Sequence, residues 1–174
     1  MKNYFENYEI WWVTGAQLLY GGDAVIAVDS HSNAMVNGLN ESGNLPYKVV
    51  YKGTANSDKE IAAICRDANN DTRCAGVITW AHTFSPAKMW IHGLQALQKP
   101  ICHFHTQFNA EIPWDTMDMD FMNLNQSAHG DRELGHIFAR MRKNHKVVVG
   151  HWQNENVQQK IAVWMRVCAA WADS

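Results

Sequence analysis

The stretch CAGVITW, residues 74–80, is a continuous run of apolar and β-branched residues. Such a run, without alternating polar positions, is typical of a strand buried on both faces, as in parallel sheets. The residues before it include Ser57–Glu60 (SDKE), a capping box in which the serine hydroxyl and the glutamate carboxylate each accept a hydrogen bond from a backbone N–H. We therefore expect a helix that runs from there toward Ala68 and is followed by a buried strand.

The residues after this strand predict a second helix. Ser85 followed by Pro86 is a strong helix-start signal, with serine as the N-cap and proline at the first helical position. The helix is expected to end before Pro100, because proline does not continue a helix. The buried strand thus lies between two helices along the chain.

The same alternation extends in both directions. Further strands are expected at residues 8–14 (YEIWWVT), 47–52 (YKVVYK), 100–104 (PICHF) and 146–150 (KVVVG), and further helices from Asp23 to near Gly43, from Asp131 onward and from near Asn154. Five strands, each followed by a helix, predict an α/β fold: a doubly wound, mostly parallel five-stranded sheet with helices on both faces, in a flavodoxin-like or Rossmann-like three-layer sandwich. Residues 1–174 are expected to form a single α/β domain, with Trp11, Trp12 and Trp80 in its core.

Composition excludes several classes of protein. The formal net charge of −2 gives no electrostatic footprint for nucleic acid, and no apolar run is long enough for a membrane span. The first residues, MKNYFENYEIWWV, are acidic where a signal peptide needs a basic region. Four scattered cysteines without a CxxC pair favour buried, reduced thiols, so we expect a cytoplasmic protein.

Residues 103–130, HFHTQFNAEIPWDTMDMDFMNLNQSAHG, show no sustained helical or strand periodicity. A loop of that length inside a compact domain is more often functional than idle. Asp115, Asp118 and Asp120 lack the spacing of an EF-hand, so we expect turn and cap residues there rather than a cation site. They surround a predicted apolar plug of Met119, Phe121 and Met122. Glu111 and Glu133 are expected to be solvated.

In doubly wound sheets, ligands bind outside the carboxyl ends of the strands. The loops expected at that edge carry amide, hydroxyl, imidazole and aromatic groups: Gln17, Tyr20, His82, Thr83, Phe84, His105, Gln107 and His151. Such a mixture suits a neutral polyhydroxylated ligand better than a phosphate. The loop GAQLLYGG, residues 15–22, is neither GxGxxG nor a P-loop, which disfavours a dinucleotide, a nucleoside triphosphate or a flavin.

Two pairs of residues leave alternatives open. His103 and His105 have the i, i+2 spacing that places both on one face of a strand, and they read either as metal ligands or, in the favoured interpretation, as histidines hydrogen-bonded to the backbone. No HExxH motif or zinc-type cluster supports a metal there. Gln126 and His129 are one helical turn apart. They are expected either to face a single ligand or merely to cap the helix near Asp131.

Three segments carry a resemblance: FHTQFNAEIPWDTMDMDFMNLNQSAHG (104–130), AGVITWAHTFSPAKMWIHGL (75–94) and YEIWWVTGAQLLYG (8–21). They closely resemble bacterial L-arabinose isomerase, and the similarity runs from about Tyr8 to the last helix. Family members are several-fold longer, so the chain resembles their N-terminal domain alone, without the central and C-terminal catalytic domains. The Mn²⁺ ligands of the family, two Glu and two His, and its acid/base glutamates lie in those later domains.

The resemblance implies an aldose–ketose isomerase that interconverts L-arabinose and L-ribulose, and also D-galactose and D-tagatose. It implies Mn²⁺ for the full-length enzyme, with no catalytic or metal residue in this chain, and a hexamer of two trimers in which this domain helps to close a neighbouring active site. Carried over by position, the implied substrate contacts are Gln17, Leu19, Tyr20, Phe84, Gln126 and His129. The alternative function is a stand-alone sugar- or polyol-binding or oligomerisation module.

Overall fold

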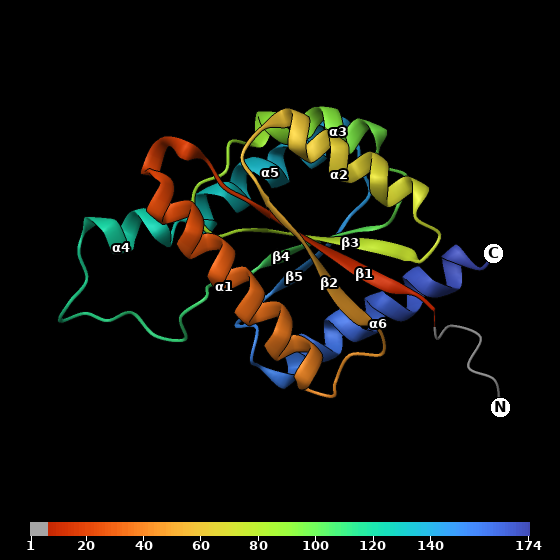
Figure 1. Ribbon diagram of the computed structural model, residues 1–174. Coiled ribbons are helices and arrows are strands. Elements are labelled where there is room, and N and C mark those ends of the chain that lie inside the picture. The colour runs from red at the N-terminus through yellow and green to blue at the C-terminus, as the bar shows by residue number, and fades with distance from the viewer. Residues whose placement is uncertain (1–6) are drawn as a thin grey trace.

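A computed structural model describes residues 7–174 and contains one five-stranded parallel sheet in the order β2-β1-β3-β4-β5 (Figure 1). The strands are β1 (Glu9–Gly15), β2 (Lys48–Ala55), β3 (Cys74–Ala81), β4 (Ile101–His105) and β5 (Lys146–Val149). The order reverses between β1 and β3, which places the topological switch point at their carboxyl ends. Residues 1–6, which contribute to the argument against a signal peptide, lie outside the described residues.

Helices cover both faces of the sheet (Figure 1). One face packs against α1 (Gly22–Glu41) and α6 (Glu155–Ala172), and the other packs against α2 (Asp58–Asn70), α3 (Ile91–Ala96) and α5 (Ser127–Met141). The shorter elements are η1 (Leu18–Tyr20), η2 (Ala87–Trp90) and α4 (Met119–Leu124). The predicted three-layer α/β sandwich is confirmed, and all four strand pairings are parallel.

The predicted aromatic core is also confirmed. Trp12 is fully buried on the face covered by α1 and α6, where its ring meets Trp80 and Phe104 edge to face at centroid distances of 5.9 and 6.0 Å. Trp11 points to the opposite face and packs in the core that α2, α3 and α5 cover. Because neighbouring residues of a strand point to opposite faces, the consecutive tryptophans supply both halves of the core.

The structure differs in detail from the prediction at two helix starts. The Ser57 hydroxyl accepts from the backbone N–H of Glu60 at 3.3 Å, as expected, but the Glu60 carboxylate accepts from Asn56 rather than from Ser57. The prediction of Ser85 as an N-cap is wrong. Its Oγ accepts a hydrogen bond from the indole N–H of Trp90, and the chain enters a 3-10 turn before α3 begins at Ile91.

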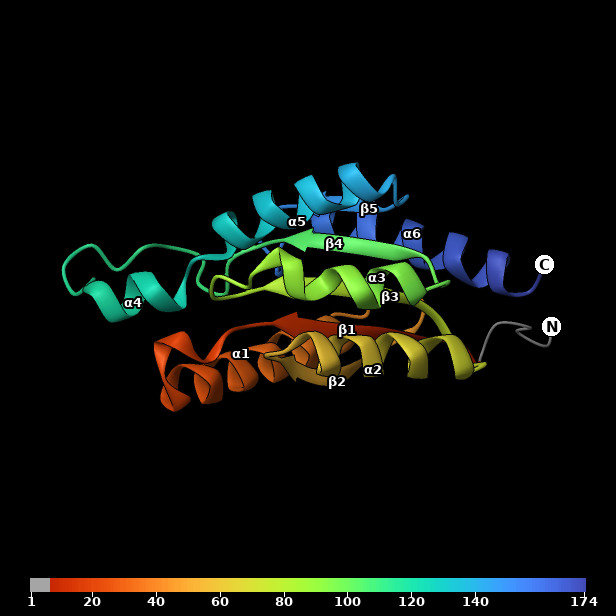
Figure 2. The same ribbon diagram turned by 90° about the horizontal axis from the view of Figure 1, so that it is seen from above.

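The stretch from residue 103 to 130 contains helices that its sequence pattern does not reveal. Asp118 caps α4 by accepting from the backbone N–H of Phe121 at 2.8 Å, which confirms its expected capping role. The expected apolar plug is wrong, because Met119 and Met122 are 65% and 48% exposed. Helix α5 begins at Ser127, four residues before the predicted start at Asp131. Figure 2 shows residues 109–126, here called the arm, extending from the carboxyl end of the sheet.

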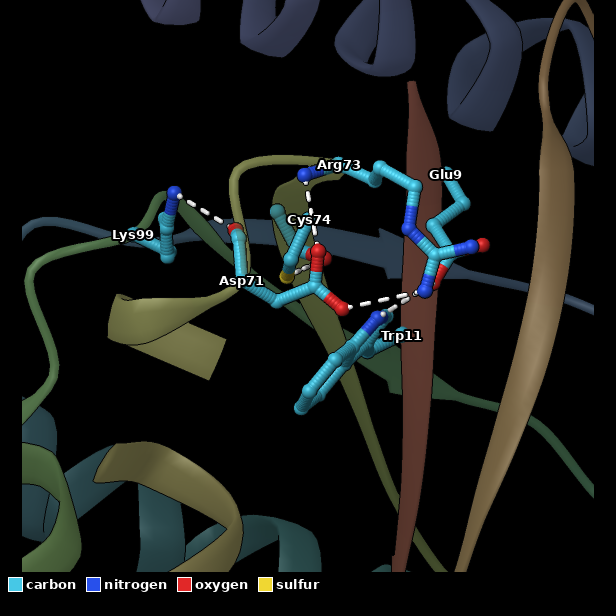
Figure 3. Close-up of polar contacts among 7 residues, drawn as sticks. Glu9, Trp11, Asp71, Arg73, Cys74 and Lys99 are labelled. Atoms are coloured by element: carbon cyan, nitrogen blue, oxygen red, sulfur yellow. Dashed lines mark hydrogen bonds and ion pairs between the residues drawn. The ribbon is translucent and has the colours of Figure 1, made fainter. Parts of the chain in front are cut away.

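A small polar network ties the opposite, amino-terminal edge of the sheet together (Figure 3). The guanidinium of Arg73 lies 3.2 Å from the Asp71 carboxylate and 3.7 Å from that of Glu9, which also accepts from the Trp11 indole N–H. A hydrogen bond from the Arg73 backbone N–H lowers the pKa of Asp71. Because Arg73 is largely exposed, these ion pairs contribute little stability and mainly fix the start of β1 beside β3.

The four cysteines Cys65, Cys74, Cys102 and Cys168 are buried and unpaired, as expected. Burial raises the pKa of the Cys65 thiol to about 11 and those of the other three to about 12. Among residues 7–174, no helix combines the length and the apolar character needed to cross a bilayer.

Gly93→Ala is expected to destabilise the fold by about 1–2 kcal/mol, because overpacking outweighs the higher helix propensity of alanine. A Cβ at this position in α3 would lie 2.8 Å from Ile61 Cγ2, 2.9 Å from Cys65 Sγ and 3.1 Å from the Ile61 carbonyl oxygen. The matched control is Gly135→Ala in α5, where a Cβ meets no atom within 4 Å. Urea denaturation should show a loss of stability for the first variant and a small gain for the second; equal effects would contradict the packing argument.

Candidate functional site

A cleft of about 860 Å³ opens beyond the carboxyl ends of β4 and β5, between the sheet and the arm. Its polar lining includes His105, Gln107, Asn109, Asn125, Gln126, His129 and His151. Its apolar lining includes Ile112, Met117, Phe121 and Met122, and charged groups are supplied by Glu111, Asp131 and Arg132. This volume suits a small organic ligand, and the mixture of amide, imidazole and apolar groups suits a neutral polar one.

The segment that leads from β4 into the arm is held by hydrogen bonds from two indoles. Trp80 donates to the carbonyl of Thr106 at 3.0 Å, and Trp152 donates to that of Phe108 at 3.0 Å. The imidazole of His151 lies 3.3 Å from the same Phe108 carbonyl oxygen. One wall of the cleft is therefore held by core residues, whereas residues 110–120 of the arm are exposed.

Gln126 and His129 lie together on the lining of this cleft. Gln126 occupies the N-cap position of α5, but its side chain makes no capping hydrogen bond. Its amide instead lies 3.2 Å from Asn123 Oδ1 and 3.4 Å from His129 Nδ1. The pair therefore presents one amide and one imidazole from the same helical turn.

The other expected substrate contacts follow β1 and β3 at the switch point, and Gln17, Leu19 and Phe84 are not among the described residues that line the cleft. Gln17 precedes η1, Leu19 within η1 is 79% exposed, and Tyr20 ends this short helix. Phe84 follows β3 and is half-buried. Figure 2 shows the start of α1, which directly follows η1, at the same end of the sheet as α4, so the six predicted residues form two groups on one edge.

A cluster of rings lies near the carboxyl ends of β3 and β4 and consists of His31, Trp80, His82 and Phe108. His31 of α1 lies 2.7 Å from His82 through Nδ1 and Nε2, and it stacks on Phe108 at a centroid distance of 3.7 Å. His82 stacks in turn on Trp80. Burial and the neighbouring His31 lower the pKa of His82 to about 3, so the pair is neutral near pH 7. The sequence pattern singled out His82 but not His31, which lies in the middle of a helix.

His103 and His105 point to the same face of β4, and both approach Asp131 of α5. His103 Nε2 lies 2.9 Å from Asp131 Oδ1, and His105 Nδ1 lies 4.0 Å from Asp131 Oδ2. Burial lowers the pKa of His105, although the Asp131 carboxylate opposes that shift. The favoured expectation of backbone partners is wrong for His103, whose partners are the side chains of Asp131 and Thr79. Asp131 itself was expected only as a helix start.

Comparisons with known proteins identify the family. Residues 4–174 match the family model described as L-arabinose isomerase N-terminal domain. The chain is 76% identical to L-arabinose isomerase of Phocaeicola vulgatus and 76% identical to that of Bacteroides thetaiotaomicron, over its whole length. It is 56% identical to the enzyme of Shigella flexneri over 98% of its length. The chain spans 34% of the length of each relative. It therefore belongs to the family of L-arabinose isomerase N-terminal domains.

Proposed function

We propose that this chain supplies substrate-pocket and subunit-interface surfaces to an L-arabinose isomerase that interconverts L-arabinose and L-ribulose, and also D-galactose and D-tagatose. The cleft carries the proposal, because Gln126 and His129 line it together with further amides and imidazoles. These groups both donate and accept hydrogen bonds, as sugar hydroxyls require. The half-buried Phe84 and the residues of η1 extend the same edge as a second set of contacts.

The proposed catalytic centre lies outside this chain. Mn²⁺, when bound in such an enzyme, polarises sugar oxygens. Among residues 7–174, the single cluster with metal-ligand spacing is His103, His105 and Asp131, which contains no glutamate. It does not match the two-glutamate, two-histidine set that the resemblance implies, so no isomerisation step is assigned to residues of this chain.

The interface role rests on exposed apolar side chains. In the arm, Trp114, Met119 and Met122 are 75%, 65% and 48% exposed, and Ile112 and Met117 are exposed beside them. Apolar side chains gathered in this way are typical of protein–protein contact surfaces. We propose that the arm contacts another subunit of a cytoplasmic homo-oligomer, a hexamer of two trimers, and that the cleft is completed there.

The direct test is an isomerase assay of the isolated chain with L-arabinose and Mn²⁺. We expect no turnover above background, because the proposed catalytic residues belong to other parts of the enzyme. Turnover by the pure chain would contradict the proposal. In a full-length isomerase that contains this domain, Gln126→Ala and His129→Ala are expected to raise KM for L-arabinose, whereas Lys59→Ala on the exposed surface of α2 should leave KM unchanged.

A stand-alone sugar- or polyol-binding module is the second candidate, favoured by the fact that a cleft is already formed within one chain. Calorimetry of the isolated chain with L-arabinose and ribitol separates the two. Micromolar binding by a monomer would support the stand-alone module. Absence of binding together with self-association would support the composite pocket.

We expect the isolated chain to self-associate through the arm as its concentration rises, and Trp114→Ala to weaken that association. Trp114 is the most exposed aromatic residue of the arm and lies in the interface that we propose. Sedimentation velocity over a concentration series measures the effect. Trp171→Ala, which removes a 55% exposed indole from α6 outside the arm, is the matched control. A strict monomer, or equal effects of both substitutions, would contradict an interface formed by the arm.

A further inference from the structure

We propose that His103, His105 and Asp131 form a binding site for a divalent transition-metal ion at the inner end of the cleft. Each residue offers one ligand atom, and these three atoms lie within 4.8 Å of one another. Two imidazole nitrogens and one carboxylate oxygen form a common donor set for zinc and neighbouring metals when further positions are left open. The proposal departs from the sequence-based expectation that this chain binds no metal.

Polar atoms without a hydrogen bond converge on this point. His103 Nε2, His105 Nε2 and Asp131 Oδ1 are all buried and lack a hydrogen-bond partner among the described residues. His103 Nε2 and Asp131 Oδ1 are 2.9 Å apart, yet neither atom has a hydrogen bond within residues 7–174. Because unpartnered buried polar atoms cost stability, the arrangement is better satisfied by an ion bound through one atom of each of the three side chains.

The surrounding structure prepares His103 to act as a ligand. Thr79 and His103 are register partners on β3 and β4, and Thr79 Oγ1 lies 2.8 Å from His103 Nδ1. The tautomer with the proton on Nδ1 would donate to this hydroxyl and would leave the lone pair of Nε2 free on the side of Asp131. A second partner that fixes the tautomer in this way is a regular feature of metal-bound histidines.

The site is closed on one side and open on the other. His103 is 1% exposed and the Asp131 side chain is 8% exposed, whereas the His105 side chain is 28% exposed. His105 and Asp131 also line the cleft. A bound ion would thus be held from the sheet and from α5, with its remaining coordination positions directed toward the cleft, where water or a hydroxylated ligand can enter.

An isolated ion pair explains less of this arrangement. A buried His–Asp pair accounts for His103 and Asp131, but it leaves the buried Nε2 of His105 without a role. The rings of His103 and His105 are nearly perpendicular, at 76° and 4.5 Å between centroids, and one nitrogen of each ring lies within 4.8 Å of the other and of an Asp131 oxygen. A three-ligand site uses both rings.

The test titrates the chain with Co²⁺ and with Zn²⁺. We expect visible absorption from one Co²⁺ per chain in a nitrogen- and oxygen-bound site, and one Zn²⁺ per chain by calorimetry in competition with a chelator of known affinity. His105→Ala and Asp131→Asn should weaken Zn²⁺ binding by more than about 100-fold, and Thr79→Val, which removes only the tautomer-fixing hydroxyl, by about 10–100-fold.

The control for Zn²⁺ binding by surface histidines is His136→Ala, at an exposed position on α5. This variant should bind Zn²⁺ like the unmodified chain, and far-UV circular dichroism verifies that every variant is folded. His105 is the decisive position, because it is partly exposed and its replacement leaves the His103–Asp131 contact in place. Absence of Co²⁺ absorption from the unmodified chain, or equal Zn²⁺ affinity of the His105→Ala and His136→Ala variants, would overturn the proposal.

Discussion

Trp12→Ala is expected to lower the free energy of unfolding by about 3–5 kcal/mol, the range found when large aromatic residues are removed from protein cores. Trp12 is fully buried in β1 and packs against the rings of Trp80 and Phe104. Its indole N–H also donates to Thr14 Oγ1 at 2.9 Å, and Thr14 contacts Ser32 of α1 at 2.8 Å. The substitution thus removes packing at the centre of the sheet and a buried hydrogen bond to Thr14, the residue through which β1 contacts α1.

Urea denaturation of the variant measures this loss, and the chain offers the same substitution in a different environment. Trp114→Ala removes an indole that is 75% exposed in the arm, so we expect it to change stability by less than about 0.5 kcal/mol at concentrations where the chain is monomeric. Comparable losses from the two substitutions would show that burial in this core does not determine stability.

Acidification from about pH 7 to about pH 5 should destabilise the fold by about 2 kcal/mol through His82 alone. Burial lowers the folded-state pKa of His82 from 6.5 to about 3. The unfolded chain therefore binds a proton in this interval that the folded chain does not bind. The contribution of neutral His82 is fully present above pH 6.5 and is lost as the pH falls from 6.5 toward 3.

The measurement compares the stability of the unmodified chain with that of His82→Gln at both pH values. Glutamine keeps a polar group opposite His31 but does not titrate, so the loss on acidification should shrink by about 2 kcal/mol. His136→Gln on the exposed surface of α5 is the control and should leave the pH dependence unchanged. An identical pH dependence for all three chains would contradict a role for His82.

The strands were predictable because their sequences are continuous apolar runs. Residues 74–80 are buried throughout in β3, and the alternation of strands and helices was sufficient to predict a parallel three-layer sandwich. The helix after β3 was not predictable in detail. Ser85 has the local pattern of an N-cap, but the indole of Trp90, five residues later, takes its hydroxyl as a hydrogen-bond acceptor. A tertiary contact thus overrides a local preference.

The sequence predicted at which edge of the sheet the candidate site lies, but not which side chains contact one another there. The parallel order places His105 and His151 beside one cleft, as the rule for strand ends requires. Asp131 was missed because its partner, His103, is 28 positions earlier in the chain, and no local spacing signals that contact. The exposure of Met119 and Met122 was missed for a related reason, since apolar composition alone does not reveal which surface another molecule covers.

The burial of all four thiols has a practical consequence. Thiolates are the form that alkylating reagents attack, and pKa values of about 11 to about 12 keep these cysteines protonated near neutral pH. Modification therefore reports the opening of the sandwich rather than the reactivity of its surface. Cys65 belongs to α2 and is buried in the core on one face of the sheet, whereas Cys168 belongs to α6 and is buried on the other face. A pulse of iodoacetamide followed by mass spectrometry would therefore time the release of each helical layer separately.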